Sequence, residues 1–160
     1  MPAYEPAMPL PRVLVVDDNA DHLELISRYL QKFWIALSFA LSANEGWKIL
    51  HSEKIDLVIL DHSLPDFDGV DFLSKLRQAS FHQPIIMLTT QSDHWLIDLA
   101  MRKGANYFVQ KTAMGCFLKK VGEIVARELG AISRKRAAPR LHLPEFVNLA
   151  GDLTVQPELL

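Results

Sequence analysis

The sequence "VILDHSLPDFDG", residues 58–69, contains the clearest indication of how this chain folds. Its apolar run ends abruptly at Asp61, and Pro65 and Gly69, residue types common in turns, follow soon after. A buried strand that ends in a carboxylate and continues into such a loop would hold that carboxylate rigidly at the edge of a sheet. The chemistry of Asp61 then depends on what the other strands bring to the same edge.

Short apolar runs alternate with segments of helical period along most of the chain. Hydrophobic residues recur every three or four positions over residues 23–33 and 118–132, as on the buried face of a helix. The apolar runs are near-continuous, which is typical of strands covered on both faces. We therefore predict a doubly wound α/β fold with a parallel sheet. The predicted strands are 12–16, 36–41 (the weakest), 56–60, 84–89 and 107–110.

Composition narrows the class of protein. The 160 residues suffice for one well-buried domain, and a formal net charge of −2 argues against a nucleic-acid-binding face. Cys116 is the single cysteine, which excludes an internal disulfide and a multi-cysteine zinc site and fits a reducing cytoplasm. The longest hydrophobic stretch, residues 33–41, is far shorter than the roughly 18 residues that a membrane span needs.

Both ends of the chain differ from its middle. Residues 1–10 are rich in proline and lack the pattern of a secretory signal, so we expect a disordered leader. The helical period stops near Ser133, and residues 134–160 show no clear period. We expect one domain over residues 11–133, followed by a linker or tail.

Polar side chains stand where the predicted strands end. Asp17 and Asp18 follow the first strand, Asp61 ends the third, Thr89 the fourth, and Lys111 comes directly after the fifth. In an open α/β sheet, ligands bind beyond the carboxyl ends of the strands. Carboxylates about 4 Å apart repel by about 4 kcal/mol at an effective dielectric of 20, so a hard cation such as Mg²⁺ is expected among them. Together these groups are suited to phosphoryl transfer onto an aspartate.

The motifs "VVDDN", "VILDHSLPDFDG", "IIMLTT" and "YFVQK" resemble, in this order and spacing, the receiver domain of two-component response regulators. The resemblance covers roughly residues 11–133 and suggests a single-domain or truncated regulator. It implies a flavodoxin-like sheet of five parallel strands in the order 2-1-3-4-5, with helices on both faces. It also implies a cytoplasmic signalling protein that is not an enzyme, although it assists its own phosphorylation and slow dephosphorylation.

The resemblance implies a role for each acidic residue at the strand ends. Asp61 would accept the phosphoryl group and contribute to the Mg²⁺ site. Asp18 would bind Mg²⁺ directly, and Asp17 mostly through water. The main-chain carbonyl of Ser63 would complete the protein ligands.

The remaining motif residues would respond to the phosphorylation of Asp61. Thr89 would be the switch hydroxyl, Lys111 would bridge Asp61 and the phosphoryl group, and Phe108 would change rotamer with Thr89. Two residues depart from the family pattern. Thr112 replaces the usual proline after the lysine, and Thr90 is larger than the very small residue usual after the threonine, so it could narrow access of the phosphoryl group.

The implied function is a switch that takes a phosphoryl group from a sensor histidine kinase or a histidine phosphotransfer protein. The alternative is a receiver-like module that docks or dimerises constitutively, with vestigial phosphorylation, for which Thr90 and Thr112 are the only support. An aspartate-nucleophile phosphatase would need a second aspartate where Ser63 stands. A dinucleotide-binding enzyme would need a Gly-rich turn after the first strand, which "VVDDNAD" lacks.

Residues 94–105 predict a helix with an unusual apolar outer face. Placing Leu96 against the sheet leaves Trp95, Ile97 and Met101 toward solvent or the helix margin. Phe108 lies on the neighbouring strand. We therefore expect the face formed by this helix, the fifth strand and the last helix to bind a partner or a second copy of the chain.

Overall fold

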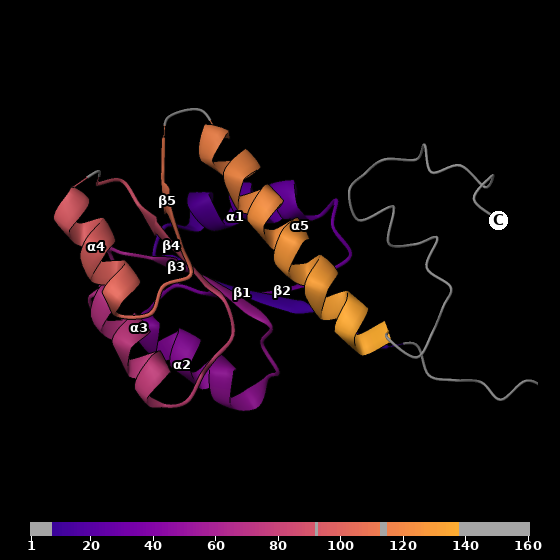
Figure 1. The fold of residues 1–160 in the computed structure, drawn as a ribbon. Coiled ribbons are helices and arrows are strands. Elements are labelled where there is room, and N and C mark those ends of the chain that lie inside the picture. Colours follow the sequence, from indigo (N-terminus) through magenta and orange to yellow (C-terminus); the bar gives the residue numbers. More distant parts are fainter. Residues whose placement is uncertain (1–7, 92, 113–114, 138–160) are drawn as a thin grey trace, which may run out of the picture.

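The fold is described by a computed structural model over residues 8–91, 93–112 and 115–137. Strands and helices alternate strictly along these residues (Figure 1). The strands are β1 (Arg12–Val16), β2 (Ala36–Ala40), β3 (Leu57–Asp61), β4 (Ile85–Thr89) and β5 (Tyr107–Gln110). The helices are α1 (Ala20–Leu30), α2 (Ala43–Ser52), α3 (Gly69–Gln78), α4 (His94–Arg102) and α5 (Cys116–Ala137).

The five strands form one parallel sheet in the order β2-β1-β3-β4-β5. This confirms the predicted fold class and strand order. Because β1 and β3 are neighbours, the chain segments that follow them leave the sheet side by side. The order reverses beside β1, and ligands bind at such a point in open α/β sheets.

Each face of the sheet is covered by its own set of helices (Figure 1). Val13 and Val15 of β1 join a cluster with α1 and α5, whereas Leu14 and Val16 join a second cluster with α2, α3 and α4. All four valine and leucine side chains are fully buried. Burial on both faces explains why the strands read as continuous apolar runs in the sequence.

Three helices begin where a side chain accepts hydrogen bonds from their free backbone N–H groups. Asn19 caps α1, Ser42 caps α2 and Asp68 caps α3. The last helix differs from the sequence prediction, because α5 continues to Ala137 rather than ending near Ser133. The rest of the predicted tail and residues 1–7 of the predicted leader lie outside the described residues.

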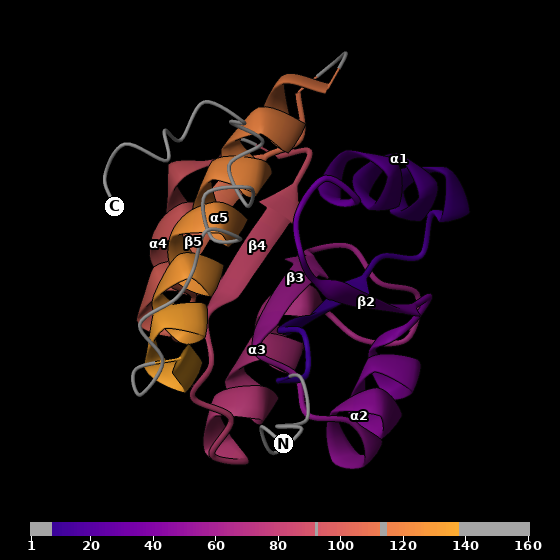
Figure 2. The ribbon, with the colours of Figure 1, turned by 90° about the vertical axis from the view of Figure 1, so that its right-hand side faces the viewer.

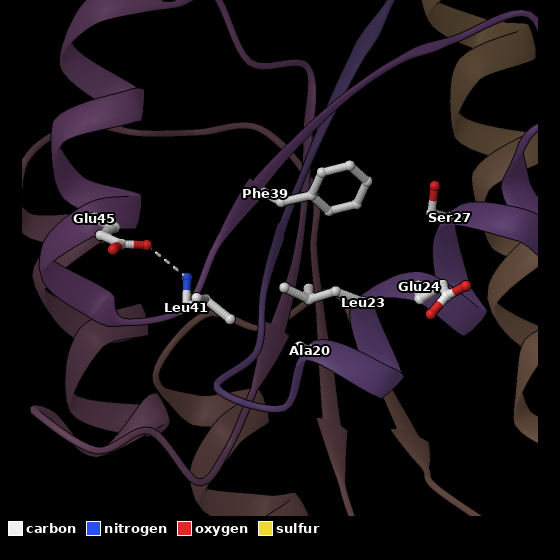
Figure 3. Close-up of a pocket in the computed structure, with 7 residues that line it drawn as sticks. All are labelled: Ala20, Leu23, Glu24, Ser27, Phe39, Leu41 and Glu45. Carbon is white, nitrogen blue, oxygen red and sulfur yellow. Dashed lines mark hydrogen bonds between the residues drawn. The ribbon is translucent and has the colours of Figure 1, made fainter.

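The edge strand β2 lies between α1 and α2 (Figure 2) and borders an open pocket of about 410 Å³. Leu23, Phe39 and Leu41 supply its apolar surface, with Glu24 and Glu45 at its rim (Figure 3). This pocket includes none of the predicted site residues. Among the described residues, no helix is long and apolar enough to cross a bilayer.

Candidate functional site

Three carboxylates converge at the carboxyl ends of β1 and β3. Asp17, Asp18 and Asp61 each offer an oxygen within 4.8 Å of the others. Asp17 and Asp61 are buried, and Asp18 is exposed to solvent. One ligand group open to water beside two that are buried fits Mg²⁺, which binds few carboxylates and retains several waters. The structure thus brings together the three acidic residues that the sequence predicted to meet.

Lys111 supplies the positive charge of this cluster. It follows β5, and its backbone N–H donates to the carbonyl oxygen of Thr89 at 2.6 Å. The ammonium nitrogen lies 2.6 Å from Asp17 Oδ2 and 3.3 Å from Asp61 Oδ2, and its side chain is only 6% exposed. A charge this buried requires close partners, and the two carboxylates provide them.

The pKa of Asp61 is raised above its ordinary value. Burial is the main cause, and the negative charge of Asp17 adds to it. The ammonium of Lys111 and the backbone N–H of Ser63 act in the opposite direction. Asp61 is therefore a carboxylate held in a costly environment, which a bound cation would relieve.

The loop after β3 is fixed by close contact with the start of α3. Gly69 donates its N–H to the carbonyl oxygen of His62 at 2.8 Å. A Cβ atom at Gly69 would lie 2.5 Å from the carbonyl oxygen of Asp61 and 2.7 Å from His62 Cα. Only glycine allows α3 to begin this close to the backbone of Asp61. The N–H of Ser63 lies 3.4 Å from Asp61 Oδ1, and Ser63 itself is exposed.

The same loop is also tied to a neighbouring helix by Asp66. Its two carboxylate oxygens accept hydrogen bonds from the N–H groups of Ala43 and Asn44 at 3.0 and 2.9 Å, at the start of α2. Slight burial opposes the effect, but these hydrogen bonds lower the pKa of Asp66. This contact could not be predicted from the sequence, because residue 66 and residues 43–44 meet only through the sheet topology.

The two predicted switch residues lie on the neighbouring strands. Thr89 ends β4 and is 1% exposed, and its Oγ1 accepts a hydrogen bond from the N–H of Gln91 at 3.0 Å. Phe108 on β5 is half-buried and packs against the cluster under α4. It pairs with Met87 in the register of β4 and β5.

The outer face of α4 carries the apolar residues that the sequence singled out. Trp95 is 62% exposed and Met101 45% exposed, whereas Ile97 is half-buried. Leu96 and Ala100 pack against the sheet.

One histidine that no sequence pattern indicated completes the cluster. His22 on α1 places Nδ1 3.0 Å from Lys111 Nζ and 3.2 Å from Asp17 Oδ2. From the sequence alone, His22 is a polar residue between the buried positions of an amphipathic helix. Its contact with Lys111 joins residues 89 positions apart, which no local pattern indicates.

Comparisons with known proteins identify the family of this chain. Residues 13–121 match the response regulator receiver domain family. The chain is 32% identical over 152 residues to the alkaline phosphatase synthesis transcriptional regulatory protein PhoP of Bacillus subtilis, covering 92% of this chain and 61% of PhoP. It is 27% identical to the uncharacterised transcriptional regulatory protein YvcP of the same organism, covering 92% of this chain and 60% of YvcP. The chain thus spans less than two thirds of the length of these relatives.

Solved structures show the same fold. A signal receiver domain from Vibrio parahaemolyticus superposes with a TM-score of 0.72 at 24% identity, covering 83% of this chain and 99% of that one. The response regulator TrrA of Thermotoga maritima, solved in complex with Mg²⁺ and BeF, gives a TM-score of 0.63 at 31% identity, covering 72% of this chain and 99% of that one. The match over residues 13–121, the fold and the strand-end cluster agree, and the chain belongs to the response regulator receiver domain family of two-component signalling.

Proposed function

We propose that this chain is a phosphorylation-dependent switch that accepts a phosphoryl group on Asp61. The observation that carries the proposal is the convergence of Asp17, Asp18 and Asp61 around the buried ammonium of Lys111. Such crowding of like charge is unfavourable without a cation, and a buried ammonium is suited to a phosphoryl oxygen. The structure of TrrA with Mg²⁺ and BeF supports the same chemistry in a relative.

In the proposed reaction, a carboxylate oxygen of Asp61 attacks the phosphorus of a phosphohistidine on a partner. The new bond joins this oxygen to phosphorus, the phosphorus–nitrogen bond breaks, and the imidazole of the partner leaves with the electron pair. Asp18, Asp61 and the main-chain carbonyl of Ser63 would hold Mg²⁺ directly and Asp17 mostly through water, and the bound ion would neutralise the charge of the phosphoryl group.

The other residues of the cluster stabilise the product. Lys111 binds an oxygen of the phosphoryl group, and Thr89 turns its hydroxyl toward the same group. At present Lys111 Nζ lies 2.6 Å from Asp17 Oδ2, and Thr89 Oγ1 accepts a hydrogen bond from the N–H of Gln91, so both side chains are expected to shift. Phe108 then follows Thr89 and changes the surface beside α4.

The phosphoryl donor we propose is a sensor histidine kinase or a histidine phosphotransfer protein in the cytoplasm. The chain acts on its own Asp61 rather than on a separate substrate, so it is a switch and not an enzyme in the usual sense. Membrane and nucleic-acid partners have no support in the described residues or in the net charge of −2.

Phosphorylation by a small-molecule phosphodonor tests this function. With acetyl phosphate and Mg²⁺, the purified chain should gain one phosphoryl group that is stable in acid and labile in base, as an acyl phosphate is. Chelating Mg²⁺ or substituting Asp61→Asn should abolish the gain, whereas Asp66→Asn in the same loop should retain it. Undiminished phosphorylation of Asp61→Asn would reject the proposal.

The output surface we propose is the face of α4, β5 and α5, with Trp95, Ile97, Met101 and Phe108 in contact with a partner or a second copy. The exposure of Trp95 and Met101 supports it. Sedimentation with and without BeF should show association that depends on the phosphoryl mimic and is weakened by Trp95→Ala. The control is Trp34→Ala, because Trp34 is also exposed but lies elsewhere. If BeF and Trp95→Ala alter neither self-association nor binding of a cognate partner, this face is not the output.

A further inference from the structure

The position of the Lys111 ammonium has three determinants, and the receiver function accounts for two of them. Lys111 Nζ lies 2.6 Å from Asp17 and 3.3 Å from Asp61, so it is held mainly by Asp17. The third neighbour, His22 Nδ1, is at 3.0 Å, closer than Asp61. With the lysine side chain only 6% exposed, little water can replace any of these three groups.

The protons at this contact follow from the donor and acceptor inventory. An ammonium only donates, so His22 Nδ1 must offer its lone pair to Lys111, which places the imidazole proton on Nε2. A proton on Nδ1 would instead direct one donor at another across 3.0 Å. The 3.2 Å contact between His22 Nδ1 and Asp17 Oδ2 is then a pair of acceptors that share one ammonium.

From this geometry we infer that His22 is a positioning residue that holds Lys111 against Asp17. Held there, the ammonium competes with Mg²⁺ for Asp17 Oδ2, and it must leave this place to reach a phosphoryl group on Asp61. His22 touches neither the metal nor the phosphoryl group in this account and acts only through Lys111. The inference rests on the proposed function, because it takes Asp17 as part of the Mg²⁺ site.

Removing the hydrogen-bond acceptor His22 Nδ1 should therefore strengthen the binding of Mg²⁺. In NMR titrations at pH 8, His22→Leu should lower the Kd for Mg²⁺ about threefold, the size expected of one half-exposed hydrogen bond. His22→Asn should stay near wild type, since the asparagine oxygen can take the place of Nδ1. The control is His82→Leu, because His82 is exposed and outside the cluster.

A double-mutant cycle separates this role from a general effect on the site. In a Lys111→Met background, His22→Leu should no longer change the Kd for Mg²⁺. The ¹⁵N shifts of the His22 ring, measured in metal-free buffer, should show a bare Nδ1 and a protonated Nε2 in wild type, and this preference should weaken in Lys111→Met.

Three results would overturn the inference alone while phosphorylation of Asp61 remains intact. These are equal Kd values for His22→Leu and wild type, an effect that persists without Lys111, or a proton on Nδ1. If the wild-type chain neither binds Mg²⁺ at the carboxylates nor becomes phosphorylated, the proposed function fails and the inference fails with it.

Discussion

At the scale of single residues, the site depends on side chains whose surroundings only the fold supplies. The acidic residues, Thr89 and Lys111 could be predicted, because each ends or follows an apolar run in the sequence. Gly69 was predicted to shape the loop, but the steric reason for glycine appears only in the folded chain, where a Cβ at this position would lie 2.5 Å from the backbone oxygen of Asp61. His22 and Asp66 could not be predicted, because both act on residues far away in the chain.

The raised pKa of Asp61 gives a prediction for stability against pH. A carboxyl group whose folded-state pKa is raised stabilises the fold fully only below its unfolded pKa, about 3.9 for aspartate. This stabilisation is lost as the pH rises through the folded-state pKa. Asparagine does not ionise, so Asp61→Asn avoids this loss of stability. In metal-free buffer at pH 7 the variant should therefore have a higher free energy of unfolding than wild type. The difference should close below about pH 4.

Thermal unfolding in the presence of a chelator measures this effect, since 1 kcal/mol moves the midpoint of a domain of this size by about 4 °C. Asp66→Asn is the control of opposite sign. The pKa of Asp66 is lowered, so its contribution is present above the unfolded pKa and is lost as pH falls through the folded pKa. A metal-free Asp61→Asn protein less stable than wild type at pH 7 would contradict the account.

At the scale of elements, the ends of the helices are fixed by contacts of two kinds. Local caps such as Asn19 on α1 follow from sequence rules, because asparagine is among the preferred N-cap residues. Others are long-range. Arg77 on α3 donates to the carbonyl oxygen of Gly104 through Nε and Nη2, at 3.0 and 2.8 Å, and so fixes the end of α4 beside β5.

Arg77 should therefore matter more to stability than its half-exposed position suggests. Its guanidinium also donates to the carbonyl oxygens of Phe81 and Gln83 and to the side chain of Asn106, all at 2.7–2.8 Å. Hydrogen bonds of charged groups contribute about 1.5–3 kcal/mol, so Arg77→Ala should lower the free energy of unfolding in urea by about 2–3 kcal/mol.

Two variants sharpen this measurement. Arg77→Lys should recover only part of the loss, because an ammonium lacks the planar fork that reaches several carbonyls. Arg28→Ala breaks an exposed pair with Glu24 on α1 and should cost less than about 0.5 kcal/mol. Full recovery with lysine, or an Arg77→Ala protein as stable as Arg28→Ala, would show that the network is not structural.

At the scale of the whole molecule, the fold was largely predictable because the central strands β1, β3 and β4 are buried on both faces. All five strands were predicted within one residue of their observed bounds, and the parallel order followed from the family resemblance. The end of the last helix was misjudged, because the sequence after Ser133 is basic and lacks an apolar face, yet α5 continues to Ala137. The helix propensity of alanine, arginine and lysine favours helix even where the sequence lacks an apolar face.

The extended α5 changes where a protease should cut. The sequence from 138 to 160 contains Pro139, Pro144 and Pro157 and no helical period, so it remains a predicted tail. Brief trypsin treatment should cleave after Arg140 before it cleaves after Arg134, and should leave a folded core, because helical backbone resists proteolysis. Resistance at Arg140, read by intact mass, would mean that the tail packs on the domain.

The central claim is that Asp61 itself receives the phosphoryl group. Borohydride reduces an aspartyl phosphate to homoserine, so it marks the modified residue permanently. After treatment with acetyl phosphate and Mg²⁺, reduction and peptide mass spectrometry should find homoserine at position 61 and not at position 17, 18 or 66. Homoserine at another aspartate, or at none while phosphate is incorporated elsewhere, would contradict the account.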